Sequence, residues 1–65
     1  MEKQLAAAYA AYIDQHGREP DYLKTNQAHY YAIEACCHTD YDTGTDTRYQ
    51  GALLMVAEID GWIFE

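Results

Sequence analysis

A chain of 65 residues can bury only one small hydrophobic core, and this limit constrains every fold open to the sequence. At this size about 60% of the surface of the unfolded chain becomes buried, which leaves room for two short helices and a small sheet. Such a core gives little depth for the water-excluding cleft that most enzymes use. We therefore expect a single domain over residues 1–65, and we expect it not to be an enzyme.

The composition indicates a folded chain in spite of its negative charge. Apolar residues make up 49% of the sequence, which also holds seven tyrosines, one tryptophan and one phenylalanine. A disordered acidic tail would lack these aromatic residues. The two cysteines are adjacent, so they make no disulfide framework and suit a reducing compartment. No basic flank precedes a long apolar run, so we expect a soluble intracellular protein without a signal peptide or membrane span.

Residues 2–16 have the pattern of an amphipathic helix. Alanine is abundant there, and larger residues recur at helical spacing along one side: Leu5, Tyr9, Tyr12, Ile13 and His16. Gly17 is well placed to end this helix. Pro20 disfavours helix in the residue before it, so residues 19–24 are expected to turn and then run extended.

A second helix is expected to start at Thr25 or Asn26, either of which can cap it, and to reach about Cys37. On a helical wheel its apolar face is formed by small residues with two larger ones at the borders: Ala28, Ala32, Ala35 and Cys36, with Tyr31 and Ile33. Tyr30 and Glu34 fall on the opposite face, which we expect to meet solvent.

The last segment, residues 49–65, is compatible with two structures. Residues 52–57 form a short apolar run that suits a buried strand or a buried helix. Asp60-Gly61 between apolar stretches is a strong hairpin signal, and residues 62–64 are aromatic and β-branched. We therefore predict an α+β fold with two helices packed on a small antiparallel sheet that ends in a C-terminal hairpin. The alternative is an all-α three-helix bundle.

The second half of the chain is strongly acidic. Seven of the eleven acidic residues follow Ile33, and Arg48 is the single Lys or Arg among them. Residues 38–48 are rich in Thr, Asp and Gly and lack apolar periodicity, so we expect a long exposed loop. Long loops in small domains are frequently functional.

Known acidic and metal-binding motifs do not fit this region. An EF-hand starting at Asp40 would need an acid or amide, a glycine and a glutamate at its positions 5, 6 and 12, where the chain has Gly44, Thr45 and Gly51. The Asp-Thr-Gly triplet of aspartic proteases and the Asp-x-Asp pair of phosphatases require apolar strands around them, whereas these flanks are polar. The adjacent cysteines are poorly spaced for zinc. We expect no metal, no cofactor and no catalytic residue.

The acidic loop can instead provide a surface for a basic partner. Direct nucleic-acid binding is not expected, because four Lys and Arg cannot offset eleven acids. In an extended loop the carboxylates of Asp40 and Asp42 would lie about 7 Å apart, a spacing of the order of that between backbone phosphates. We predict a partner-binding surface with the following members: Glu34, Asp40, Asp42, Asp46, Tyr30 and Tyr41. The alternative is a charge that serves only solubility.

In its length, its charge of −7, its acidic segment 40–46 and its aromatic content, the chain resembles small anti-CRISPR proteins of bacteriophages, in particular those that imitate DNA. We expect a monomer, and the resemblance implies a place in the cytoplasm of the host bacterium. It implies binding to the basic PAM- or target-recognition site of a CRISPR effector, with a type I surveillance complex favoured. Neither catalysis nor a cofactor is implied.

A second resemblance concerns the order of the expected elements. Residues 17–23, followed by a helix and then Tyr49-Gln50-Gly51, are similar in rhythm to helix–strand–helix–strand pieces of phage structural proteins. This alternative implies a structural or assembly module that binds another protein through apolar and tyrosine contacts.

Overall fold

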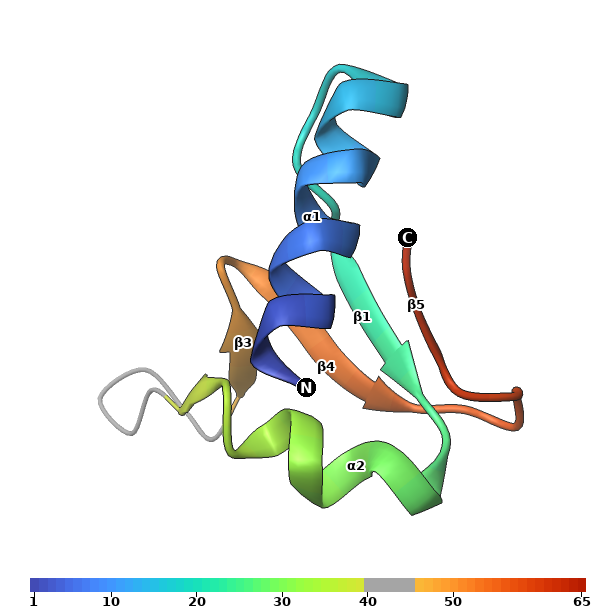
Figure 1. Cartoon of the computed structure of the whole chain (residues 1–65). Coiled ribbons are helices and arrows are strands. Elements are labelled where there is room, and N and C mark those ends of the chain that lie inside the picture. The colour runs from blue at the N-terminus through green and yellow to red at the C-terminus, as the bar shows by residue number, and fades with distance from the viewer. Residues whose placement is uncertain (40–45) are drawn as a thin grey trace.

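The computed structural model describes residues 1–39 and 46–65, which form two helices and a five-stranded sheet (Figure 1). The helices are α1 (Glu2–His16) and α2 (Gln27–Glu34), and the strands are β1 (Tyr22–Thr25), β2 (His38–Thr39), β3 (Thr47–Tyr49), β4 (Ala52–Val56) and β5 (Trp62–Phe64). The predicted α+β class is confirmed, and the three-helix bundle is wrong. Neither described helix is long and apolar enough to cross a membrane.

The sheet is mixed, with the strand order β2-β3-β4-β1-β5. The central strand β1 runs parallel to β4, with Leu23 beside Leu54, and antiparallel to β5, with Leu23 beside Phe64. The pairs β2–β3 and β3–β4 are both antiparallel. The prediction of a purely antiparallel sheet is therefore wrong at the β1–β4 pair.

The predicted C-terminal hairpin does not form, although both of its expected strands do. Because β1 lies between β4 and β5, the Asp60-Gly61 turn does not join neighbouring strands. The connection passes round the end of β1, where Ala57 N–H donates to the Thr25 carbonyl at 2.9 Å and Asn26 N–H donates to the Gly61 carbonyl at 2.8 Å. Inserting β1 satisfies its backbone groups on both sides and buries Leu23 and Thr25 completely. This tertiary gain outweighs the local turn signal.

A tight hairpin forms instead between β3 and β4. Its two loop residues, Gln50 and Gly51, have φ of 50° and 93°. Positive φ at both positions is the requirement of the type I′ turns that suit twisted antiparallel strands. Strands β2 and β3 also pair, with Thr39 beside Thr47. The prediction of an irregular loop over residues 38–48 is therefore wrong at both of its ends.

The first helix has the predicted bounds. Gly17 ends it with a φ of 70°, and the Gly17 N–H donates to the Ile13 carbonyl at 2.8 Å. Leu5 is fully buried, and Tyr9 and Tyr12 pack against the core. His16, which was expected on the same side, is exposed.

The second helix is shorter and is rotated relative to its predicted face. It ends at Glu34, and the residue that it buries completely is Ile33. The expected core alanines are exposed: Ala28, Ala32 and Ala35. Burying one isoleucine removes more apolar surface from water than burying an alanine, so Ile33 determines which side of α2 faces the sheet. The predicted outward pair, Tyr30 and Glu34, is half-buried as a consequence.

The core lies on one face of the sheet, beneath the two helices. Its buried apolar residues come from both helices and from every strand except β2: Leu5, Leu23, Ile33, Tyr49, Ala52 and Phe64. The ring of Tyr9 contacts those of Tyr49 and Phe64 edge-on, at centroid distances of 5.8 and 5.7 Å. Figure 1 shows α1 running across the sheet and α2 along one end of it. No described element covers the opposite face of the sheet.

Removing the cap of α2 is expected to destabilise the fold measurably. Asn26 Oδ1 accepts from the His29 N–H at 3.0 Å and contacts His29 Nδ1 at 2.7 Å. We expect Asn26→Ala to lower the free energy of unfolding by about 1 kcal/mol, because the helix N–H loses its acceptor. Urea denaturation followed by circular dichroism measures the change. The exposed neighbour Gln27→Ala is the control, and equal losses in both variants would contradict a capping role.

Candidate functional site

The structure describes three of the six residues predicted to bind a partner. Glu34 and Tyr30 lie on α2, and Asp46 precedes β3. The remaining three lie outside the described residues: Asp40, Tyr41 and Asp42. The described members thus lie on α2 and just before β3, which are on either side of β2 in the sequence.

Tyr30 and Glu34 lie one helical turn apart and interact with each other. A hydrogen bond to Glu34 is the main reason why the pKa of Tyr30 is raised, with burial as the second cause. Tyr30 was predicted to be an exposed aromatic, and this is wrong because the residue is half-buried. The exposed aromatic of α2 is the next residue, Tyr31, whose exposed fraction is 74%. The Tyr30 and Tyr31 rings meet edge-on at 5.5 Å.

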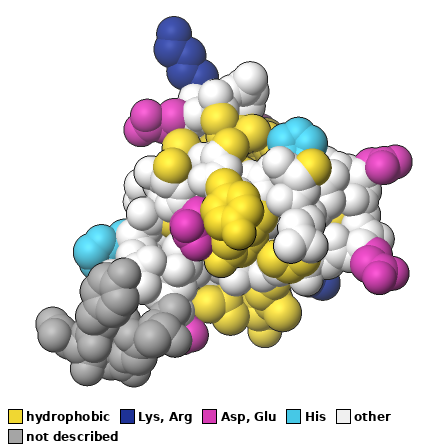
Figure 2. All heavy atoms as spheres, turned by 90° about the horizontal axis from the view of Figure 1, so that it is seen from below, with side chains coloured by type: hydrophobic (Ala, Val, Ile, Leu, Met, Phe, Trp, Pro, Cys, Tyr) yellow, Lys and Arg dark blue, Asp and Glu magenta, His cyan; other side chains and the backbone are white. Residues whose placement is uncertain are grey.

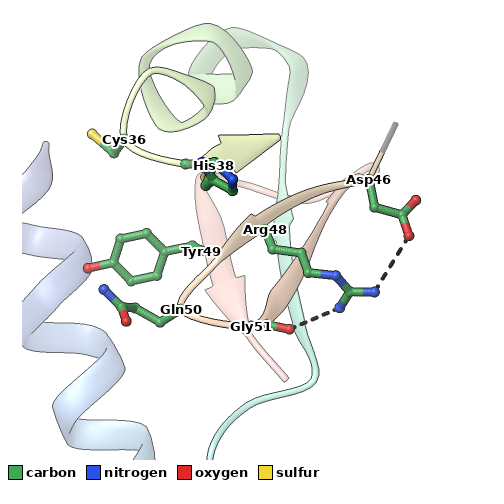
Figure 3. A pocket seen from close by; sticks show the side chains of 8 residues that line it. Cys36, His38, Asp46, Arg48, Tyr49, Gln50 and Gly51 are labelled. Carbon is green, nitrogen blue, oxygen red and sulfur yellow. Dashed lines mark hydrogen bonds and ion pairs between the residues drawn. The ribbon is translucent and has the colours of Figure 1, made fainter. Parts of the chain in front are cut away.

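Asp46 is exposed, and its charge is partly neutralised by Arg48. The Asp46 Oδ2 lies 3.5 Å from an Arg48 guanidinium nitrogen, and the other terminal nitrogen donates to the Gly51 carbonyl at 3.0 Å (Figure 3). An exposed ion pair of this kind contributes about 0–1 kcal/mol. The pair also reduces the negative charge that Asp46 presents to solvent.

A shallow pocket of about 470 Å³ surrounds this ion pair. Figure 3 shows the Arg48 and Asp46 side chains extending to one side of β3, while Tyr49 and Gln50 point towards α1. His38 lies beside Arg48, its partner in the β2–β3 register. The hydrogen bond from Arg48 to the Gly51 carbonyl connects the guanidinium to the β3–β4 turn.

The two cysteines border the same pocket and behave as packing residues. Cys37 Sγ donates to the Ile33 carbonyl at 3.1 Å, and Cys36 Sγ to the Ala32 carbonyl at 3.6 Å. Burial, followed by the neighbouring Cys36 and Glu34, raises the pKa of Cys37 to about 11, so at neutral pH it is a protonated thiol. Across residues 1–39 and 46–65 no three His, Cys, Asp or Glu side chains form a group able to hold a metal ion.

The acidic side chains are spread over the surface. Of the nine acidic residues within the described ranges, three pair with a cation: Asp21 with Arg18 at 3.0 Å, Glu65 with Lys24 at 2.7 Å, and Asp46 with Arg48. Figure 2 views the molecule from the side of α2 and shows apolar side chains in the middle of that face. The acidic side chains on it lie apart from one another, most of them at its margins.

The uncovered face of the sheet carries exposed apolar residues that sequence reasoning did not single out. The strand registers place Tyr22 beside Leu53, and Lys24 beside both Met55 and Ile63. Tyr22 is 42% exposed, Met55 40% and Ile63 52%. Alternation along each strand places these residues on one face of the sheet, but the strand order is needed to identify that face as the uncovered one.

Comparison with protein-family models, curated proteins and solved structures found no match to this chain.

Proposed function

We propose that this protein is an inhibitor that binds a basic, DNA-recognising site of a CRISPR effector complex in the host cytoplasm and competes with DNA there. The supporting observation is the surplus of negative charge at the surface. Six of the nine described acidic residues form no ion pair, and residues 40–45 add two more aspartates. A surface of this sign is attracted to sites that bind phosphates, and it repels nucleic acid itself.

The acidic residues at the β2–β3 end contribute most of the binding in this proposal. Asp46 stands at the start of β3, and Asp40 and Asp42 belong to the segment that joins β2 to β3 in sequence. Glu34 ends α2 four residues before β2. Together these four carboxylates come from one short stretch of chain, residues 34–46. The inhibitor needs no cofactor, because it acts by occupying the site.

Charge reversal tests the proposal directly. We expect the triple variant Asp40→Lys, Asp42→Lys and Asp46→Lys to lose inhibition of a type I surveillance complex, measured as competition with PAM-containing DNA and as protection of phage in a CRISPR-bearing host. The matched control reverses Glu2, Asp14 and Glu19, which are exposed and lie on α1 or just beyond it. Both variants change the net charge equally, so a loss confined to the first supports the β2–β3 end. Undiminished inhibition by a folded triple variant would refute the assignment.

Salt dependence measures how far the contact is electrostatic. A protein that replaces about four phosphate contacts should lose roughly 10²-fold in affinity between 50 and 200 mM salt. An apolar interface should barely respond over this range.

A second candidate function is favoured by the uncovered sheet face. Its exposed Tyr22, Met55 and Ile63 suit a small structural or assembly module that binds another protein by apolar contact. The module would lose binding in Met55→Lys and keep it in the triple aspartate variant, which is the reverse of the result expected for the inhibitor.

A further inference from the structure

Strand β5 forms an open edge of the sheet. It pairs with β1 on one side only, and no described element lies beyond it (Figure 1). The Asn26 N–H donates to the Gly61 carbonyl, and Glu65 and Tyr22 exchange hydrogen bonds of 2.8 and 2.9 Å, so Gly61 and Glu65 both face β1. Because bonding alternates along an antiparallel strand, the backbone groups of Trp62 and Phe64 point away from the sheet. Two donors and two acceptors are therefore free for another chain.

A groove runs beside this open edge, on the side of the sheet that α1 covers. Its volume is about 400 Å³, and side chains of α1 and β5 form its walls: Ala8, Ala11, Tyr12, His16, Trp62 and Phe64. The small side chains of Ala8 and Ala11 leave space between α1 and β5. Phe64 is buried and Trp62 half-buried, and their rings meet edge-on at 6.1 Å, so the floor of the groove is aromatic.

The edge and the groove together have the geometry for strand addition. A segment that pairs with β5 would turn every second side chain to the α1 side of the sheet, where the groove lies. Main-chain hydrogen bonds to Trp62 and Phe64 would supply affinity, and the groove would select apolar side chains at two alternate positions.

The charges around β5 determine which segment fits. The strand is bounded by Asp60 and Glu65, both exposed, and no Lys or Arg lines the groove. The protein as a whole has a net charge of −7. A second copy pairing antiparallel through β5, with Trp62 opposite Phe64 of its partner, would bring Glu65 opposite Gly61 and close to Asp60 of its partner at both ends, which like-charge repulsion disfavours. A segment with basic ends would meet Asp60, which pairs with no described cation, and Glu65, whose charge is partly neutralised by Lys24 at 2.7 Å.

We propose that β5 and the α1–β5 groove bind an extended peptide segment of a partner protein that has apolar residues at two alternate positions and basic residues at its ends. This site is separate from the acidic β2–β3 end, because β5 and β2 are the opposite edges of the sheet. It is also independent of whether that acidic end competes with DNA.

A designed peptide tests the geometry. The probe is Lys-Leu-Thr-Leu-Lys with both termini blocked, so that its threonine lies opposite Ile63 and its leucines enter the groove. Titration followed by ¹⁵N NMR is expected to shift the Trp62 and Phe64 amides. The composition-matched peptide Leu-Lys-Thr-Lys-Leu is expected to bind at least 10-fold more weakly. Equal binding of the two peptides, or shifts confined to other strands, would overturn the proposal.

Backbone methylation separates strand addition from simple apolar contact. N-methylation of both leucines removes the two donors that face β5, and we expect at least 10-fold weaker binding. N-methylation of the threonine, whose N–H points away from β5, should be tolerated. If both methylated peptides bind like the parent, the peptide does not add as a strand and the proposal is wrong.

A pair of helix variants tests the groove in the protein. Ala11→Leu fills the groove and is expected to weaken binding at least 10-fold, whereas Ala10→Leu, exposed on α1 and outside the groove, should leave it unchanged. Leucine is a good helix former, so both variants should fold. Equal peptide affinities in the two variants would show that the groove takes no part in binding and that the proposal is wrong. Concentration-dependent shifts of Trp62 and Phe64 without peptide would assign the edge to a second copy and overturn the proposed partner.

Discussion

Replacing Leu23 by alanine is expected to lower the free energy of unfolding by about 3 kcal/mol. Leu23 is fully buried on the central strand, between Leu54 of β4 and Phe64 of β5. The truncation loses the transfer free energy of the side chain and leaves a cavity between the two neighbouring strands, which cannot both close over it. A 65-residue domain has a total stability of only about 3–10 kcal/mol, so the variant should be largely unfolded on warming.

Thermal and urea denaturation, followed by circular dichroism, measure this loss. Met55→Ala is the matched control: it truncates a side chain of similar size in the adjacent strand β4, but one that is exposed on the opposite face of the sheet. Its expected cost is below about 1 kcal/mol. A Leu23→Ala variant as stable as Met55→Ala would show that β1 does not occupy the centre of the core.

The contrast between these two residues also shows what the sequence can predict about this fold. The alanine-rich pattern that ends at Gly17 predicts α1 with its observed bounds, and the apolar runs of the last segment predict β4 and β5 as strands. These are local signals, since each depends on residues that are neighbours in the chain. Strand order is not local. No residue near Asp60-Gly61 indicates that β1 will lie between β4 and β5, the two strands that this turn connects. The insertion is favoured by the burial of Leu23 and Thr25, which lie about forty residues earlier in the chain.

The orientation of α2 illustrates the same limit within one element. On a helical wheel the three alanines and Cys36 form the centre of the predicted apolar face, with Ile33 at its border. In the structure Ile33 is buried and the alanines are exposed. The wheel counts apolar positions, but burial follows apolar area. The hairpin between β3 and β4 was missed for a different reason: Gln50-Gly51 is a weaker turn signal than Asn-Gly, although its glycine serves the same positive φ.

Prediction of the candidate site was limited in a similar way. The pairing of Tyr30 with Glu34 follows from their spacing on a helix, which the sequence shows, but their partial burial follows from the rotation of α2. Asp46 and Arg48 are close in sequence, but their ion pair depends on β3 being a strand. The polar, acidic composition of residues 38–48 predicted a loop there instead. The open edge at β5 and its groove require the strand order, and so no sequence pattern indicated them.

The protein should lose stability steeply between pH 9 and pH 11, and Cys37 should account for a measurable part of the loss. Burial raises the pKa of this thiol from 9.0 to about 11 in the folded state. Between these values the unfolded chain releases the thiol proton and the folded chain keeps it, so unfolding becomes more favourable as pH rises. Burial also raises the pKa of Tyr49, which adds a loss of the same sign at higher pH.

The expected contribution of Cys37 is about 1–1.5 kcal/mol, because a shift of two pKa units sets an upper limit of about 2.7 kcal/mol and solvent screening at a half-buried thiol reduces it. Urea denaturation at pH 8, 9, 10 and 11, with a reductant present, measures the slope. In Cys37→Ala the free energy of unfolding should fall by about 1–1.5 kcal/mol less over this pH range than in the parent protein. Cys36→Ala should keep most of the pH dependence, since burial is the first cause of the raised pKa of Cys37. Identical slopes in all three proteins would mean that the Cys37 thiol is accessible to water, and that the turn after α2 is not packed against the core.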